Sequence, residues 1–227
     1  MARRTQAQLA QTRQSIIDAA TALFAERGFA HAQVAQIAER AGVGISAFYG
    51  QFRDKEELFL LIAQDAFEEV HAGVLEVRRS MNMQSPLDVL MGVQRTYDLV
   101  FEMLARHKEI TMSILRSGLA AVPALEQLFW GICDAVADEM TRDFARANAD
   151  NVVKVDRPRD LSDAMVGMIF QLANRMTRDE SLTPHQAAKV CTKFTLGALL
   201  MYMPHDTLHR MMPILATFPG TGSIQNS

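Results

Sequence analysis

The sequence predicts an all-α protein in which a small N-terminal helical domain precedes a larger helical bundle. Apolar residues recur at helical spacing through nearly all of the 227 residues, and the breaks between these stretches fall at Gly, Pro or polar segments. No alternating apolar–polar run is long enough to predict a strand. The hydrophobic content of 49% and the net charge of −3 exclude a disordered chain, and the length suffices for a buried core.

Three helices are expected in an N-terminal domain over residues 1–53. The first has an apolar face from Leu9 to Phe24 and stops at Gly28, and two short helices follow at 34–41 and 45–52. Asp54 can cap a long helix that begins at Lys55 and runs to about Met81. The remaining helices are expected at 86–106, 108–117, 123–148, 161–180, 183–203 and 206–216. Residues 54–216 would form the bundle, and residues 217–227 a disordered tail.

Charge is distributed unevenly along the chain. Residues 1–55 carry seven basic and four acidic side chains, a net charge of +3, whereas residues 56–227 carry −6. This basic N-terminal segment in an otherwise acidic chain favours an anionic partner for residues 1–55 alone, although a net charge of +3 can also arise by chance.

The chain has few features of a secreted or membrane protein. Cys133 and Cys191 are far apart in sequence and match no disulfide framework or zinc-finger spacing. The longest apolar run has eight residues, Leu196 to Met203, which is too short to cross a bilayer. No apolar signal segment follows the N-terminal charges, so we expect a cytoplasmic protein that does not bind membranes.

The two short helices form a helix-turn-helix pattern. The turn is Gly42-Val43-Gly44, in which Gly42 can adopt positive φ, and the small Ala38 allows close approach of the helices. Phe48 and Phe52 occupy the buried positions of the second helix, which leaves its other face for a DNA major groove.

At these residues the sequence resembles the DNA-binding domain of TetR/AcrR-type transcriptional regulators. The similarity covers about residues 12–60 and rests on Phe24-Ala25-Glu26-Arg27-Gly28-Phe29, Val34, Ile37-Ala38, Ala41-Gly42-Val43, Phe48-Tyr49, Phe52 and Lys55-Glu56-Glu57-Leu58. The resemblance implies a homodimer with an N-terminal helix-turn-helix, which binds double-stranded operator DNA, and a C-terminal bundle that binds a small effector. It also implies that Tyr49 and Lys55 contact phosphate.

The sequence departs from this family in the recognition helix. Residues 44–50 contain no Arg, Lys or Asn, so bidentate reading of guanine or adenine is excluded, whereas Ile45 and Ala47 can touch thymine methyl groups. Ala32-Gln33 replaces the Thr/Ser pair that often opens the preceding helix. Arg3 and Arg4 either enter a minor groove or form a solvated terminus. The residues expected to contact DNA are Arg3, Arg4, Gln33, Gly44, Ile45, Ser46, Ala47, Tyr49, Gln51 and Lys55.

The bundle provides candidates for two further sites. An effector pocket, suited to an apolar ligand because its lining is rich in Met, is expected from Gln94, Tyr97, Phe101, Met103, His107, Met112, Arg116, Phe129, Trp130 and Cys133. A dimer interface is expected from two apolar stripes, Leu161, Met165, Met168, Ile169, Leu172 and Met176, and Val190, Phe194, Gly197 and Met201. The alternative for the stripes is that they only close the monomer core.

Motifs for dinucleotide binding and for metal binding occur without the neighbouring elements or ligands that these sites require. Residues 42–47 match GxGxxA, but a helix and not a strand precedes them. Glu68 with His71, and His205 with His209, lack further ligands, so no metal site, cofactor or catalytic residue is predicted. We therefore expect a ligand-responsive repressor and no enzyme. The alternatives are a helical interaction module or an unusual enzyme in which the helix-turn-helix is only structural.

Overall fold

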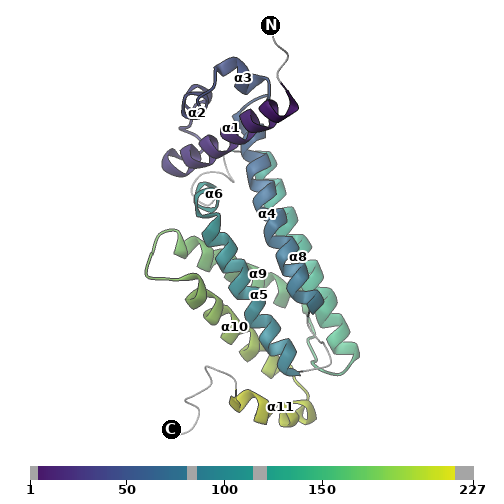
Figure 1. Ribbon diagram of the computed structural model, residues 1–227. Helices are drawn as coiled ribbons and strands as arrows, with labels where there is room; N and C mark the ends of the chain where they lie inside the picture. Colours follow the sequence, from purple (N-terminus) through teal and green to yellow (C-terminus); the bar gives the residue numbers. More distant parts are fainter. Residues whose placement is uncertain (1–4, 81–85, 115–121, 218–227) are drawn as a thin grey trace. The chain divides into compact units, whose positions relative to one another are not determined.

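The computed structural model describes residues 5–80, 86–114 and 122–217, which contain ten helices and no strand (Figure 1). The predicted all-α class is confirmed. The helices are α1 Gln6–Arg27, α2 Val34–Arg40, α3 Ile45–Tyr49, α4 Lys55–Ser80, α5 Pro86–Arg106, α6 Lys108–Ser113, α8 Pro123–Ala149, α9 Pro158–Met176, α10 Pro184–Met201 and α11 His205–Thr217. No helix in the described part of the chain is long and apolar enough to cross a membrane.

The chain divides into two compact units. The first unit comprises Met1–Ala72 and Met103–Ile132, and the second comprises Gly73–Glu102 and Cys133–Ser227. In the first unit, α1, α2 and α3 pack together, and α6 packs against α1. In the second unit, α9 packs against α10. The expected boundary between residues 53 and 54 is a functional division and stays a prediction.

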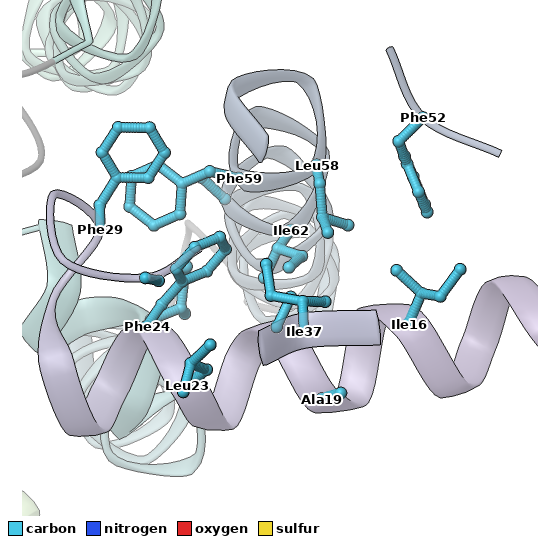
Figure 2. Close-up of a cluster of buried hydrophobic side chains, with 14 of the residues drawn as sticks. Ile16, Ala19, Leu23, Phe24, Phe29, Ile37, Phe52, Leu58, Phe59 and Ile62 are labelled. Atoms are coloured by element: carbon cyan, nitrogen blue, oxygen red, sulfur yellow. The ribbon is translucent and has the colours of Figure 1, made fainter. Parts of the chain in front are cut away.

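The core of the first unit is built around three phenylalanine rings. Phe24 of α1 and Phe59 of α4 have ring centroids 5.0 Å apart, and Phe29, in the loop before α2, stacks on Phe59 at 4.8 Å. Figure 2 shows these rings at one end of the cluster, with Ile16 and Phe52 toward the other. Every one of these five side chains is at most 7% exposed. They anchor the helix-turn-helix to α1 and to the start of α4.

Local signals place the helix ends. Thr5 caps α1: its Oγ1 accepts a hydrogen bond from Gln8 N at 3.3 Å, and Gln8 Oε1 accepts from Thr5 N at 2.9 Å. The helix therefore begins before Leu9, which is 39% exposed and not part of the buried face. Gly28, with φ of +75°, ends the helix as predicted.

Several predicted boundaries differ from the structure. α9 starts at residue 158 because Pro158 occupies its first turn, and it ends at Met176, earlier than expected. α3 ends at Tyr49, before Phe52. The predicted helical residues 81 and 115–117 lie outside the described chain, as do residues 218–227 of the expected tail.

The segment between α8 and α9 is more ordered than its polar sequence indicates. Val153 and Val155 are buried and pack with Phe144 and Met165. The Asn148 side chain bonds both to Val155 N, at 2.9 Å, and to Val155 O, at 2.8 Å. A segment predicted only as a break therefore forms part of the core of the second unit.

Candidate nucleic-acid interface

The turn of the helix-turn-helix is made by backbone hydrogen bonds. Ala41 N donates to Ile37 O at 2.9 Å, and Val43 N donates to Ala38 O at 2.9 Å, so that the chain reverses directly after α2. Gly42 has φ of +67°, and an added Cβ there would meet no atom within 4 Å. The requirement for glycine at this position is therefore conformational and not steric.

The recognition helix, α3, has one buried and one exposed face. Phe48 is fully buried, and Phe52 beyond the helix is 2% exposed. On the other face, Ile45 is 50% exposed and Tyr49 is 57% exposed, while Gly44 and Ser46 are also exposed. Tyr49 is therefore not a core residue. Ala47 is half-buried, so it offers less surface than its neighbours.

The other residues expected to contact DNA near α3 differ in how exposed they are. Gln33 is exposed at the start of α2, where its backbone N donates to Gln36 Oε1 at 3.2 Å. Gln51 is half-buried, and its carbonyl oxygen accepts a hydrogen bond from Arg13 Nη1 at 3.3 Å. Arg3 and Arg4 lie outside the described residues.

Lys55 bonds to the loop that precedes α2. Its Nζ donates to three carbonyl oxygens of the loop before α2, those of Phe29, Ala30 and Ala32, at 2.8, 3.3 and 2.9 Å. An ammonium group has three N–H donors, so no donor is left for a phosphate. Burial lowers the pKa of Lys55. In this conformation the Lys55 ammonium group bonds to the loop carbonyls, and the expected phosphate contact stays a prediction.

Acidic partners neutralise other basic side chains of the same region. Arg40 makes a bidentate ion pair with Glu26, with N–O distances of 2.7 Å, and the Arg40 hydrogen bond lowers the pKa of Glu26. Arg53 Nε pairs with Asp54 Oδ2 at 2.9 Å. Asp54 also caps α4, since its Oδ1 accepts from Glu57 N at 2.8 Å. The predicted cap is confirmed, and two of the four acidic side chains in the net charge of +3 lie directly beside basic ones.

The predicted effector residues divide between the two units, and Arg116 lies outside the described chain. In the second unit, Phe101 is fully buried, Gln94 Nε2 donates to Asp98 Oδ2 at 2.9 Å, and Tyr97 Oη lies 2.7 Å from Thr195 Oγ1. Burial raises the pKa of Tyr97 to about 12 and that of Cys133 to about 11. The Cys133 thiol is therefore uncharged and unreactive near neutral pH.

The other predicted effector residues lie in the first unit. Met103 and Phe129 are buried, Met112 is half-buried, and Trp130 is 52% exposed with its ring edge against Phe129. His107 Nε2 lies 2.8 Å from Glu69 Oε2.

The first unit also contains a half-open pocket of about 270 Å³ between α1, α4 and the α5–α6 junction. Apolar side chains form much of its wall, and a charged cluster of Glu69, Arg106 and His107 lies among them. The lining residues are Ile17, Thr21, Ile62, Asp65, Ala66, Glu69, Arg106, His107 and Ile110. Sequence reasoning found only His107, because the other residues come from helices whose packing has no sequence motif.

The two stripes expected to form a dimer interface differ in exposure. Phe194 and Met201 of α10 are 65% and 84% exposed, and Val190 is 49% exposed. Gly197 is exposed between them, with open space around its Cα. On α9, Met165 is only 2% exposed and packs in the core of the second unit, so it is not available to a second chain. Leu161, Met168, Ile169, Leu172 and Met176 are half-buried.

The motifs typical of other chemistries lie in helical surroundings. Residues 42–47 form the turn and α3, after helix α2, as expected for a helix-turn-helix. No group of three or more His, Cys, Asp or Glu side chains suited to a metal ion occurs among the described residues, which include Glu68, His71, His205 and His209.

Comparisons with known proteins agree with this geometry. Residues 16–62 match the family described as bacterial regulatory proteins, tetR family. The HTH-type transcriptional regulator AcrR of Shigella flexneri is 37% identical over 94 residues, which are 41% of this chain and 43% of AcrR. The matching segment thus spans less than half of this curated relative.

Solved structures extend the similarity of fold to most of the chain. The fatty acid degradation regulator FadR of Bacillus halodurans has a TM-score of 0.66 at 19% identity, over 87% of this chain and 98% of FadR. NalD, the secondary repressor of the MexAB-OprM multidrug efflux pump in Pseudomonas aeruginosa, has a TM-score of 0.67 at 21% identity, over 84% and 97%. The helix-turn-helix of this chain thus matches the tetR family of bacterial regulatory proteins, and most of the chain shares the all-helical fold of these two solved structures.

Proposed function

We propose that this protein is a DNA-binding transcriptional repressor that binds a pseudo-palindromic operator as a homodimer and is released by a small apolar effector. The observation that carries the DNA-binding part is the two-faced recognition helix. Phe48 anchors α3 in the core, while Ile45, Ser46 and Tyr49 are exposed on a helix of the size that a major groove admits. NalD, a neighbour in fold, is named as a repressor, which supports the direction of regulation.

The exposed side chains favour a thymine-containing half-site. Ile45 and Ala47 offer apolar contacts to thymine methyl groups, and Ser46 can hydrogen-bond to either kind of base. Tyr49, Gln33 and Gln51 would position the helix through phosphates, and Gly44 at the start of α3 is also exposed. Arg3 and Arg4 would add minor-groove contacts. Two symmetric helices would read half-sites about one helical turn apart.

Selection of bound duplexes from a random pool tests this proposal. We expect a pseudo-palindrome with thymines in each half-site. Tyr49→Phe should weaken binding to selected and random duplexes alike, by about fivefold, because one phosphate hydrogen bond is lost. Ile45→Ala should instead change the selected sequence. Equal affinity of the wild type for selected and random duplexes would favour the helical interaction module.

The exposed stripe on α10 supports the homodimer. Val190, Phe194, Gly197 and Met201 follow one another at helical spacing, so they lie on one face. A row of exposed apolar side chains of this kind marks an interaction surface, and the exposed Gly197 allows a close approach of a second helix. A second copy of the chain would cover this row as part of a four-helix bundle.

The pocket of the first unit supports the effector switch. Ile17 and Thr21 of α1 line the pocket, and Arg13, which contacts the end of the helix-turn-helix, lies one turn before Ile17 on the same helix. A ligand that displaces α1 would therefore disturb the recognition helix. FadR, another neighbour in fold, is named as a regulator of fatty acid degradation, which agrees with an apolar effector.

Thermal-shift screening with apolar metabolites, followed by operator titration, tests the switch. A ligand that binds this pocket should weaken operator binding by about 1–3 kcal/mol, and operator should weaken ligand binding equally. Ala66→Leu fills the pocket and should abolish the thermal shift. Ala72→Leu makes the same change at an exposed position of α4 and should retain the shift. A ligand that saturates the protein without changing operator affinity would contradict the proposal.

A further inference from the structure

Arg13 of α1 reaches the C-terminal end of the recognition helix. Its Nη1 donates to the carbonyl oxygen of Gln51 at 3.3 Å, and its guanidinium carbon lies 4.4 Å from the centroid of the Phe52 ring. α1 also packs against α3. The planar cation therefore lies at the turn that directly follows α3, although it belongs to a helix that is not part of the helix-turn-helix pattern.

The Phe52 ring beneath the guanidinium is fixed by the core. Phe52 is buried, and its ring centroid lies 5.8 Å from that of Phe48, the fully buried anchor of α3. The exposed Tyr49 in turn has its ring centroid 5.4 Å from that of Phe48. A cation that is already held on a fixed aromatic face loses little further freedom when it binds a partner. Arg13 is therefore preorganised at the end of the recognition helix.

Most of the hydrogen-bonding capacity of Arg13 is unused. A guanidinium group has five N–H donors, and the carbonyl oxygen of Gln51 accepts from one of them. Within residues 5–80, 86–114 and 122–217, Arg13 has no carboxylate at ion-pair distance and no second hydrogen-bond acceptor. The side chain is only half-buried, so part of the group is accessible to a partner outside the chain.

Neighbouring arginines of the same segment have acidic partners. Arg40 pairs with Glu26, and Arg53 pairs with Asp54. Arg13 thus carries a positive charge that no acidic side chain of the described chain neutralises, at one end of the recognition helix. A phosphate diester suits such a group, because two N–H donors of the guanidinium fork match two phosphate oxygens.

We propose that Arg13 contacts a phosphate of the DNA backbone beside the C-terminal end of the recognition helix. This inference rests on the proposed operator binding, and it adds a contact from α1 to those that the sequence predicts. Gln51, whose carbonyl oxygen accepts from Arg13, is itself expected at a phosphate, so both side chains would meet the same stretch of backbone. The contact positions the protein and does not read bases, since every sequence has the same phosphates.

The salt dependence of DNA binding tests this role. Each phosphate contact contributes about −0.9 to the slope of log K against log salt concentration. Arg13→Gln removes the charge and retains an amide that can donate to the Gln51 carbonyl. Arg142→Gln is the matched control, because it makes the same change at an exposed position of α8 in the second unit, which does not contain the helix-turn-helix.

We expect Arg13→Gln to weaken binding to selected and random duplexes alike, by about 100-fold for a dimer that loses two charged hydrogen-bonded contacts. Its salt slope should be shallower by about 1.8, or about 0.9 for each protomer. Arg13→Lys keeps the charge and loses the planar fork, so it should retain the wild-type slope and recover part of the affinity. Arg142→Gln should match the wild type in affinity and slope.

Melting temperatures separate this contact from one that only stabilises the fold. A lower melting temperature for Arg13→Gln, with an unchanged salt slope well below that temperature, would show that Arg13 only ties α1 to the turn after α3. That result would overturn the proposal. A wild type that bound no duplex would overturn the proposed function as well, whereas equal affinities of the wild type and Arg13→Gln for the operator would overturn this inference alone.

Neutral methylphosphonates, placed one at a time in the selected operator, locate the contact. At the phosphate that Arg13 meets, the replacement should weaken wild-type binding by about tenfold and leave the binding of Arg13→Gln unchanged, because the same interaction cannot be lost twice. At the other contacted phosphates, both proteins should lose affinity equally. If no position distinguished the two proteins, Arg13 would not contact a phosphate.

Discussion

Replacing Phe194 with glutamate is expected to convert the protein from a dimer to a monomer at micromolar concentration. Phe194 is 65% exposed at the centre of the α10 stripe, between Val190 and Gly197. In the proposed dimer it becomes buried against the second copy, and an unpaired carboxylate at that position would be costly to desolvate. Because two linked half-site contacts bind far more tightly than one, operator affinity should fall by about 100- to 10,000-fold.

Light scattering and operator titration measure this effect. Lys189→Gln is the matched control, since it also changes the charge by −1, at an exposed position of α10 off the stripe. The control should remain dimeric. If Phe194→Glu also remained dimeric with unchanged operator affinity, the α10 stripe would not be the dimer interface, and another occupant would have to be sought for it.

Replacing Phe59 with alanine is expected to destabilise the first unit by about 3–5 kcal/mol. Phe59 is fully buried, with Phe24 at 5.0 Å on its edge and Phe29 at 4.8 Å on its face. Its removal leaves a cavity at the point where α1, α4 and the loop before α2 meet. The same loop carries the carbonyls that Lys55 holds, so the helix-turn-helix should loosen as the unit loses stability.

Urea unfolding followed by circular dichroism measures the loss. Trp130→Ala removes a larger aromatic side chain from the same unit at a site that is 52% exposed, and it should cost about 1 kcal/mol. Equal losses for the two variants would show that the phenylalanine cluster does not govern the stability of the unit.

Much of the fold was predictable from the sequence, because its signals are local. The spacing of Ile16, Ala20 and Phe24, the stop at Gly28 and the cap at Asp54 each act within a few residues. They placed the helices of the N-terminal region with errors of a few residues. The turn at Gly42 and the alternation of buried Phe48 with exposed Tyr49 are equally local, so the buried and exposed faces of α3 were also predictable from the sequence.

The sequence could not show how basic side chains are used, since that depends on what lies nearby in space. Lys55 and the carbonyl of Phe29 are 26 residues apart, and Arg13 and the carbonyl of Gln51 are 38 apart. Every residue type has a backbone carbonyl, so no pattern of side chains in the sequence predicts which carbonyls accept these bonds. The same holds for the pocket walled by Ile17, Ala66 and Ile110.

The sequence by itself thus determined the helices, the helix-turn-helix motif and the face of α3 that is exposed. Only the tertiary structure decided that Met165 belongs to the core of the second unit while Phe194 remains exposed, and that Lys55 bonds to the carbonyls of the loop before α2. The physical reason is that helical periodicity predicts which residues of one helix share a face. Whether that face is buried, and against which residues, depends on how the other helices pack around it.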